Sequence, residues 1–266
     1  MIFATGKTGT IGRHLSPNSK ALKVDLKDSL FTKSLPHFGE NDSLIHLAGI
    51  VGVKNVDSDP DLSYLVNVQG SVTLAEYFRK NSNGQFIYIS TSHVYQPGLV
   101  KLRENADTGP ASLYAKQKLD SENLLFSIFE KEPERLCVLR VFSILDWDVK
   151  PFTLGGGIRK LAAENSEYTL QFCDDVRDFL TPRSTAMIIE NIARERTLSG
   201  IVNLSSGTGL TIRQAASQML NSAGFTIPHD QLKPGNSSIP YLVGDNSKLM
   251  EALPDLDLSW KPSIKG

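Results

Sequence analysis

Three glycines that follow a short apolar run place the strongest constraint on how this chain folds. The run Ile2–Thr5 is typical of a buried strand, and Gly6, Gly9 and Gly12 come directly after it in the spacing G-x-x-G-x-x-G. Glycines at this spacing allow a tight turn from a strand into a helix and let backbone N–H groups approach a pyrophosphate. The segment is not a P-loop, because Lys7 lies between the glycines and not after the last one. We therefore expect a dinucleotide-binding turn with a helix behind it.

Apolar runs alternate with segments of helical spacing along the rest of the chain. We expect strands at Ser43–Leu47, Gln85–Ser90, Leu136–Phe142 and Ile201–Leu204, and helices at Val66–Arg79, Tyr114–Phe129, Ile158–Asn165, Arg183–Arg196 and Thr211–Ala223. This alternation predicts an α/β fold with a doubly wound parallel sheet of the Rossmann type.

The regular alternation weakens after the fifth predicted strand. Residues 1–145 are predicted to form the dinucleotide-binding domain, and residues 146–266 a smaller substrate-binding region. Sheet elements are expected to return near residues 176–206, so the two parts are interleaved. A proline and three consecutive glycines predict a loop at Asp146–Gly157.

Composition excludes several classes of protein. The 28 Lys and Arg residues balance 29 Asp and Glu residues, giving a net charge of −1, so a basic surface for nucleic acid or membrane is not expected. No apolar stretch has the roughly 20 residues of a membrane span, and the start MIFATG does not resemble a secretory signal. The two cysteines, Cys137 and Cys173, allow no disulfide framework, and the five histidines show no ligand-like grouping. We expect a cytoplasmic protein that binds no metal.

A tyrosine and a lysine lie four residues apart in a predicted helix. Tyr114 and Lys118 would therefore share one helix face. A tyrosine hydroxyl has a pKa of about 10 and is a poor acid or base at neutral pH, but a neighbouring ammonium group favours the phenolate. The hydroxyls of Ser90, Thr91 and Ser92 follow a predicted strand at its carboxyl end, where ligands bind in such sheets.

Asp25 is a candidate ligand for the ribose of a dinucleotide. At the end of a second strand it would bind both ribose hydroxyls and favour NAD. Only twelve residues separate it from Gly12, which is short for a helix, a loop and a strand. Asp25 and Leu26 could instead end the third strand near the adenine, with the second strand lost or shortened. Lys20 and Lys23 could meet a 2′-phosphate, so both NAD and NADP remain open.

Nine short motifs resemble, in order, those of the extended short-chain dehydrogenase/reductases, also called the NAD-dependent epimerase/dehydratase family. They are TGKTGTIG at the start, IHLAG at Ile45–Gly49, NVQGSVTLAEY at Asn67–Tyr77, YISTSHVY at Tyr88–Tyr95, YAKQK at Tyr114–Lys118, LRVF at Leu139–Phe142, RDF at Arg177–Phe179, NLSSG at Asn203–Gly207 and DNSKL at Asp245–Leu249. The resemblance covers nearly the whole chain.

The resemblance implies a role for each matching residue. Tyr114 would be the catalytic acid/base, Lys118 would bind the nicotinamide ribose and lower the pKa of Tyr114, and Thr91 would hydrogen-bond the reacting oxygen. Ser92 would replace Thr91 if the strand ended one residue later. The cofactor, NAD or NADP, would contact Gly6, Thr8, Gly9, Thr10, Ile11, Gly12, Asp25, Leu26, Leu47, Ala48, Gly49, Tyr114 and Lys118. We expect His46 to pack at a strand end and His93 to be a spacer beside the site.

The family resemblance also suggests the substrate. Arg177 would pair with the diphosphate of a nucleotide sugar, although a structural Arg–Asp pair is an alternative. Ser92-His93 stands where the 4,6-dehydratases of this family carry Asp-Glu, which disfavours elimination of water. Two departures weaken the substrate prediction: SILDWD follows LRVF in place of an Asn and a Tyr-Gly-Pro, and Asn236–Gly244 lacks a second phosphate-binding arginine.

Three hypotheses for the function follow. The first is reduction of a 4-keto-6-deoxysugar nucleotide, and the second is NAD-dependent 4-epimerisation of a nucleotide sugar. The third is a non-catalytic dinucleotide sensor or scaffold, against which the intact Thr91, Tyr114 and Lys118 argue. The helices at Asn67–Arg79 and Tyr114–Phe129 could form a homodimer seam, or their apolar faces could belong to the core.

Overall fold

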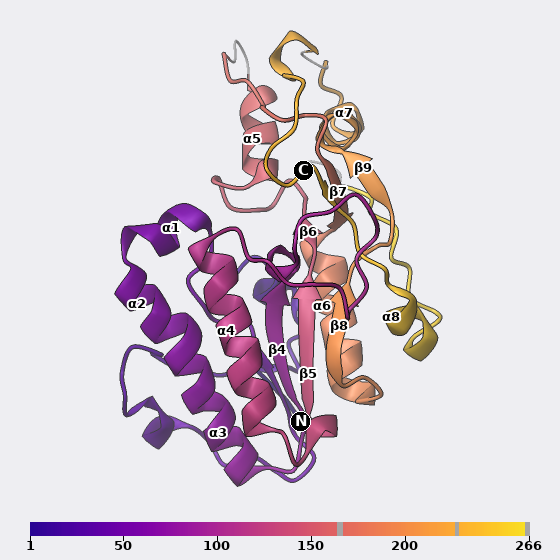
Figure 1. Ribbon diagram of the computed structural model, residues 1–266. Coiled ribbons are helices and arrows are strands. Elements are labelled where there is room, and N and C mark those ends of the chain that lie inside the picture. The colour runs from indigo at the N-terminus through magenta and orange to yellow at the C-terminus, as the bar shows by residue number, and fades with distance from the viewer. Residues whose placement is uncertain (164–166, 227–228, 264–266) are drawn as a thin grey trace.

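Six parallel strands form the main sheet of the computed structural model, which describes residues 1–163, 167–226 and 229–263. The strands lie in the order β2-β1-β3-β4-β5-β8. Their bounds are β1 Ile2–Thr5, β2 Lys20–Ala21, β3 Ser43–His46, β4 Phe86–Thr91, β5 Leu136–Val141 and β8 Gly200–Leu204. Because every neighbouring pair is parallel, all carboxyl ends meet at one edge of the sheet (Figure 1). The predicted Rossmann-type sheet is confirmed.

Helices cover both faces of this sheet (Figure 1). One face carries α3 and α4, and the other carries α6. The helices are α1 Val53–Ser58, α2 Pro60–Tyr64, α3 Ser71–Asn81, α4 Leu113–Ile128, α5 Leu154–Leu161, α6 Pro182–Glu195, α7 Ile212–Ser222 and α8 Ser247–Ala252. Short helical turns complete them: η1 Gly12–His14, η2 Phe31–Ser34, η4 Ser92–Val94, η5 Pro133–Arg135 and η6 His229–Gln231, together with a π-helical stretch, η3 Leu65–Gly70, between α2 and α3.

The alternation of side chains along the strands explains why helices cover both faces of the sheet. In β4, Ile87 and Ile89 belong to the cluster that includes α6, whereas Phe86 and Tyr88 belong to the cluster that includes α3 and α4. Successive side chains of a strand point to opposite faces, and all six residues of β4 are buried. A strand that is apolar on both sides needs helices on both sides.

A smaller lobe stands above the carboxyl edge of the main sheet (Figure 1). Its sheet has the order β10-β7-β6, with β9 antiparallel to β7. These strands are β6 Ser143–Ile144, β7 Val176–Leu180, β9 Gly209–Thr211 and β10 Tyr241–Leu242. Helix α7 packs on this lobe and starts at the predicted cap Thr211, whose hydroxyl accepts from Gln214 N–H in a capping box. The chain leaves the main sheet after β5, builds part of the lobe, and returns through α6 and β8.

The expected helix behind the glycine turn is absent, which corrects the prediction. Among the described residues before β2, only the single turn η1 is helical. The segment is too short for more and contains Pro17, which cannot donate a backbone hydrogen bond. Tertiary contacts hold it instead: the Lys7 amine donates to the Ser16 and Ser19 carbonyls, and Glu190 of α6 accepts from Ser16 N–H and the Ser19 hydroxyl.

The predicted loop at Asp146–Gly157 is also partly wrong, because α5 begins at Leu154. Its three glycines lie inside the helix, and neighbouring backbone comes very close to two of them. A Cβ on Gly155 would lie 2.5 Å from the Asp146 carbonyl oxygen, and one on Gly156 would lie 2.2 Å from the Pro151 carbonyl oxygen. Glycine is therefore required by packing, which outweighs its poor helix propensity. The predicted helix end at Asn165 lies outside the described residues.

Three further observations concern membrane-spanning helices, cysteines and metal ligands. None of the helices in the described parts of the chain has the length and apolar character that a membrane crossing requires. Cys137 and Cys173 are both buried free thiols. Within residues 1–163, 167–226 and 229–263, no group of three His, Cys, Asp or Glu side chains is arranged to hold a metal ion.

Candidate active site

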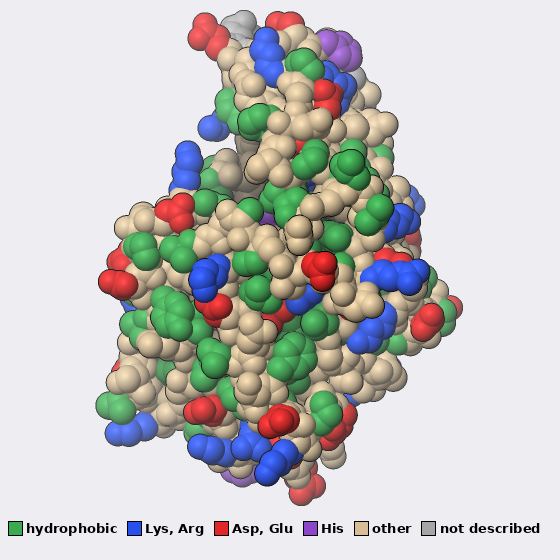
Figure 2. Space-filling view, viewed as in Figure 1, with side chains coloured by type: hydrophobic (Ala, Val, Ile, Leu, Met, Phe, Trp, Pro, Cys, Tyr) green, Lys and Arg blue, Asp and Glu red, His purple; other side chains and the backbone are tan. Residues whose placement is uncertain are grey.

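A cavity of about 480 Å³ opens at the carboxyl edge of the main sheet. It is lined by Gly6, Thr8, Gly9, Thr10, Ile11, Gly12, Leu47, Ala48, Gly49, Val51, Ile89, Ser90, Thr91, Tyr114, Lys118, Val141, Phe142, Ile144, Val149, Lys150 and Thr153. The surface is hollowed between the large body and the upper lobe (Figure 2). The glycine turn, the end of β4 and the tyrosine–lysine pair of α4 thus meet around one space.

The glycine turn has a geometry that only glycine permits at two positions. Gly6 adopts φ +68°, and a Cβ there would lie 2.7 Å from the Ala48 nitrogen. A Cβ on Gly12 would lie 2.2 Å from the Gly6 carbonyl oxygen, so the turn folds tightly on itself. Among the described residues, the N–H groups of Thr10 and Ile11 meet no hydrogen-bond acceptor. Free backbone donors at a tight turn suit the diphosphate of a dinucleotide.

Lys118 is one of the residues that line the cavity, and most of its side chain is buried. Its ammonium group donates to the Ile89 carbonyl at 2.7 Å and to the Tyr88 hydroxyl at 3.2 Å, and it lies 4.4 Å from the centre of the Tyr88 ring. Burial lowers the pKa of Lys118 to about 8, although the carboxylate of Glu122 acts in the opposite direction. The lysine is held at the end of β4, within the cavity, where it could meet ribose hydroxyls.

The hydroxyl of Tyr114 keeps its proton at neutral pH. Burial raises the pKa of Tyr114 to about 12. The expected lowering of this pKa by Lys118 is not found. The Lys118 ammonium group donates to the Tyr88 hydroxyl and the Ile89 carbonyl instead. A protonated hydroxyl that lines the cavity can donate a proton to a carbonyl oxygen bound there.

The end of β4 is fixed by hydrogen bonds and a buried ion pair. The Thr91 hydroxyl accepts from His93 N–H at 3.3 Å, which closes the turn η4. The Ser90 hydroxyl donates to Glu122, whose carboxylate pairs with Arg140 at 2.7 Å on the neighbouring strand β5. Because α4, β4 and β5 share these bonds, Thr91 has a defined place relative to α4.

A buried polar network supports the loop that follows β3. The Thr5 hydroxyl lies 2.7 Å from His46 Nδ1, and His46 Nε2 lies 2.9 Å from the Ser71 hydroxyl. Burial, together with the charge of Lys118, lowers the pKa of His46 to about 3, so the imidazole is neutral. Asn67 of η3 holds the same loop, since it accepts from Ile50 N–H and donates to the Ile50 carbonyl. The expectation that His46 packs at a strand end is confirmed.

Four predicted site residues do not line the cavity. Asp25 is exposed, and its side chain accepts a hydrogen bond from Lys27 N–H. It lies three residues after Leu22, whose N–H donates to the Ala4 carbonyl of β1. Leu26 is buried in the core against Gly70. The second strand is therefore shortened to two residues, and the third strand is Ser43–His46, so Asp25 and Leu26 do not end it.

Ser92 and Arg177, the other two of these residues, are the ones expected to bind the substrate. Ser92 is buried in η4. Arg177 donates to Asp175 at 2.8 Å and to the Val176 carbonyl at 2.9 Å, and burial lowers its pKa. Partial removal from water, and then the Arg177 charge, lower the pKa of His93. The Arg177 guanidinium therefore lies near enough to the His93 imidazole to favour its neutral form.

Sequence reasoning missed the cavity residues that come from the strand ends and from the loop before α5. They are Val51, Ile89, Val141, Phe142, Ile144, Val149, Lys150 and Thr153. The strand-end residues follow from the rule that parallel strands open their site at one edge. The path of the loop leaves no periodic signal in the sequence.

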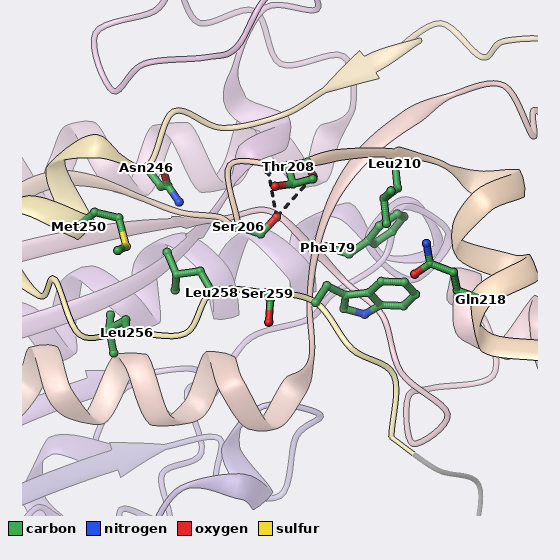
Figure 3. Close-up of a pocket in the computed structure, with 11 residues that line it drawn as sticks. Phe179, Ser206, Thr208, Leu210, Gln218, Asn246, Met250, Leu256, Leu258 and Ser259 are labelled. Carbon is green, nitrogen blue, oxygen red and sulfur yellow. Dashed lines mark hydrogen bonds between the residues drawn. The ribbon is translucent and has the colours of Figure 1, made fainter. Parts of the chain in front are cut away.

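A second hollow, of about 470 Å³, lies in the upper lobe (Figure 3). Phe179, Leu210, Met250 and Trp260 line it together with small polar side chains such as Ser206 and Thr208. No described residue lining it carries an acidic or basic side chain. This hollow therefore lacks the proton donor and the charges that the first cavity combines.

Comparison with known proteins decides the family. Residues 2–145, more than half of the chain, match the family described as NAD dependent epimerase/dehydratase family. The chain belongs to this family. As an NAD-dependent epimerase/dehydratase family member it is an NAD(P)-dependent enzyme, and the glycine turn and cavity fit a dinucleotide.

Relatives of this family member match over almost its full length. GDP-6-deoxy-D-mannose reductase of Pseudomonas aeruginosa is 24% identical, covering 99% of this chain and 92% of that protein. GDP-6-deoxy-D-talose 4-dehydrogenase of Aggregatibacter actinomycetemcomitans is 23% identical over 95% of this chain and 90% of its own.

Solved structures show the same fold. The Pseudomonas aeruginosa protein RMD, complexed with NADPH, superposes with a TM-score of 0.78 at 22% identity, covering 99% of this chain and 94% of that one. A UDP-N-acetylglucosamine 4-epimerase from Methanobrevibacter ruminantium gives a TM-score of 0.81 at 22% identity, with coverage of 97% and 93%.

Proposed function

We propose that this protein reduces the 4-keto group of a 6-deoxysugar nucleotide with a nicotinamide dinucleotide as hydride donor. The observation that carries the proposal is the gathering of Thr91, Tyr114 and Lys118 around the cavity that the glycine turn opens. Two relatives matching almost the whole chain are named as enzymes of GDP-linked 6-deoxyhexoses, which supports this substrate class.

Each residue has a distinct task in this reaction. The reduced dinucleotide supplies a hydride to the carbonyl carbon of the sugar. Tyr114, protonated because burial raises its pKa to about 12, donates a proton to the oxygen that becomes negative. Thr91 holds the same oxygen through its hydroxyl, and Lys118 binds ribose hydroxyls beneath it. Preorganised donors at a developing oxyanion provide much of the acceleration in such sites.

Substitution of Tyr114 tests the catalytic assignment. Tyr114→Phe removes the proton donor but keeps the ring, so turnover should fall by about 10²- to 10⁴-fold, while dinucleotide affinity stays within about twofold. The measurement is the loss of reduced-nicotinamide absorbance with a GDP-linked 4-keto-6-deoxyhexose, alongside titration of the dinucleotide. Tyr77→Phe, on α3 and outside the cavity, is the matched control. Turnover of Tyr114→Phe close to that of the parent protein would remove Tyr114 from the mechanism.

A second candidate is 4-epimerisation. It is supported by a UDP-glucose 4-epimerase of Dictyostelium discoideum, 21% identical over 90% of this chain and 75% of its own. The two functions differ in cofactor turnover: an epimerase regenerates its NAD, whereas a reductase consumes reduced dinucleotide in proportion to product. Mass spectrometry of the dinucleotide that co-purifies, and product analysis after one equivalent of cofactor, separate them.

The same proposal includes a substrate anchor and an assembly. Arg177 would bind the substrate diphosphate by leaving Asp175, since a guanidinium group pairs well with phosphate oxygens. A homodimer would pair the helices at Asn67–Arg79, in η3 and α3, and Tyr114–Phe129, in α4, where Leu124 is an exposed apolar side chain. We place the enzyme in the cytoplasm, because both cysteines are free and buried as reduced thiols.

A further inference from the structure

The segment 146–153, which we call the strap, crosses the mouth of the cavity between β6 and α5. At one side Asp148 accepts from Arg13, directly after the glycine turn, and forms an ion pair with it at 2.9 Å. At the other side Phe152 lies against Gly52, where a Cβ would be 3.2 Å from its ring. The strap therefore touches the main body on both sides of the dinucleotide cavity.

The strap is held in shape by α5 behind it. Gly155 and Gly156 allow the carbonyl oxygens of Asp146 and Pro151 to approach the helix closely. Arg159 of α5 donates to the Trp147 and Val149 carbonyls. A loop fixed by its backbone in this way presents its side chains in defined directions.

One strap side chain brings a positive charge to the cavity. Val149, Lys150 and Thr153 line it together with the glycine turn. Lys118 and Lys150 are the charged side chains among the described lining residues, and no acidic side chain accompanies them. Lys118 already donates to Tyr88 and the Ile89 carbonyl, whereas no hydrogen bond or ion pair joins the Lys150 amine to another described residue.

The glycine turn needs such a charge more than a usual dinucleotide site does. In a Rossmann fold the diphosphate sits at the N-terminus of an α-helix, but here a single turn, η1, follows the glycines. The two negative charges of a diphosphate would meet backbone N–H groups without the dipole of a full helix. A lysine that lines the same cavity would supply the missing positive potential.

We propose that Lys150 binds the diphosphate of the dinucleotide, so that the strap adds a charged contact to the cofactor site that the glycine turn forms. This inference rests on the dinucleotide cofactor of the family and not on which sugar is reduced. It assigns to the strap a binding task that compensates for the shortened N-terminal region.

The test measures binding without turnover. ADP-ribose, which carries the diphosphate and lacks nicotinamide, is titrated into the full-length protein by isothermal calorimetry at two salt concentrations. Lys150→Met should weaken binding about tenfold and reduce its salt dependence. Lys150→Arg should retain most of the affinity, and Lys101→Met, an exposed lysine far along the chain from the strap, should bind like the parent. Thermal unfolding of each variant checks that the fold is intact.

Two results would overturn the inference. The first is an ADP-ribose affinity and salt dependence in Lys150→Met equal to those of the parent protein. The second is a loss restricted to GDP, titrated with reduced dinucleotide bound, because the lysine would then serve the substrate diphosphate. Either result is independent of the proposed reduction, since a protein that reduces no sugar still binds ADP-ribose.

Discussion

Lys118 shows how one buried charge can link the cofactor site to pH. Its surroundings combine removal from water, which lowers its pKa to about 8, with the Glu122 carboxylate, which favours the charged form. Below this pKa the amine is an ammonium group that donates to two oxygens. Above it the amine is neutral and its attraction for the negatively charged dinucleotide is lost.

Dinucleotide affinity should therefore fall as the pH rises through about 8. The pKa of Lys118 is lower than that of a lysine in the unfolded chain, so Lys118 loses its proton at a pH at which we expect the protein to remain folded. The dinucleotide affinity should therefore follow the titration of this one group. Calorimetric titration of NADH from pH 6.5 to about 9.5 measures it, and Lys118→Met should bind weakly with a flat profile. An affinity that is constant across this range in the parent protein would contradict the assignment.

The gathering of Thr91, Tyr114 and Lys118, the proposed catalytic residues, could be predicted because their positions follow simple geometric rules. Tyr114 and Lys118 share a face through the i, i+4 spacing of a helix, and Thr91 ends a parallel strand. The protonation of Tyr114 could not be predicted, because it depends on burial and on which oxygens Lys118 reaches. Lys150 was missed since nothing in a sequence reveals where an irregular loop leads.

At the level of elements, α5 and the strap form one unit. The three glycines of α5 look like a loop in the sequence, yet two of them, Gly155 and Gly156, let strap carbonyls pack onto a helix. The opposite error occurred at the glycine turn, where a familiar motif predicted a helix that the short segment to β2 cannot hold. In both places the contacts of distant segments outweigh local propensity.

Gly156→Ala should displace the strap and destabilise the protein. Its Cβ would lie 2.2 Å from the Pro151 carbonyl oxygen, and such overpacking costs about 1–3 kcal/mol of unfolding free energy. Denaturant unfolding measures the loss, and ADP-ribose affinity should decrease as well. Gly98→Ala is the matched control, because a Cβ there meets no atom within 4 Å. Equal stability of the two variants would show that the strap does not pack on α5 as described.

At the level of the whole molecule, one hydrophobic core contains residues from both sides of the predicted division at residue 145. The cluster on one face of the main sheet combines Ile45 and Ile87 with Ile189 and Ile192 of α6 and Val202 of β8. These last three residues follow the first part of the upper lobe in the chain. The strand near residue 201 was predicted from its apolar run, whereas its place beside β5 and the packing of α6 on the sheet follow only from the structure.

A fragment of residues 1–145 should fail to fold on its own. It would lack β8 and α6 and would expose one apolar face of the sheet, including Ile45, Ile87 and Cys137. Circular dichroism during heating should show no cooperative transition for the fragment and a clear one for the full chain. A cooperative transition in the fragment would establish residues 1–145 as an independent domain.

The position of the strap has a consequence for how the two parts of the molecule are joined. The strap follows β6 of the upper lobe but rests, through Asp148 and Phe152, on the main body. Residues of both parts line the cavity, so we expect a bound dinucleotide to hold the two parts together.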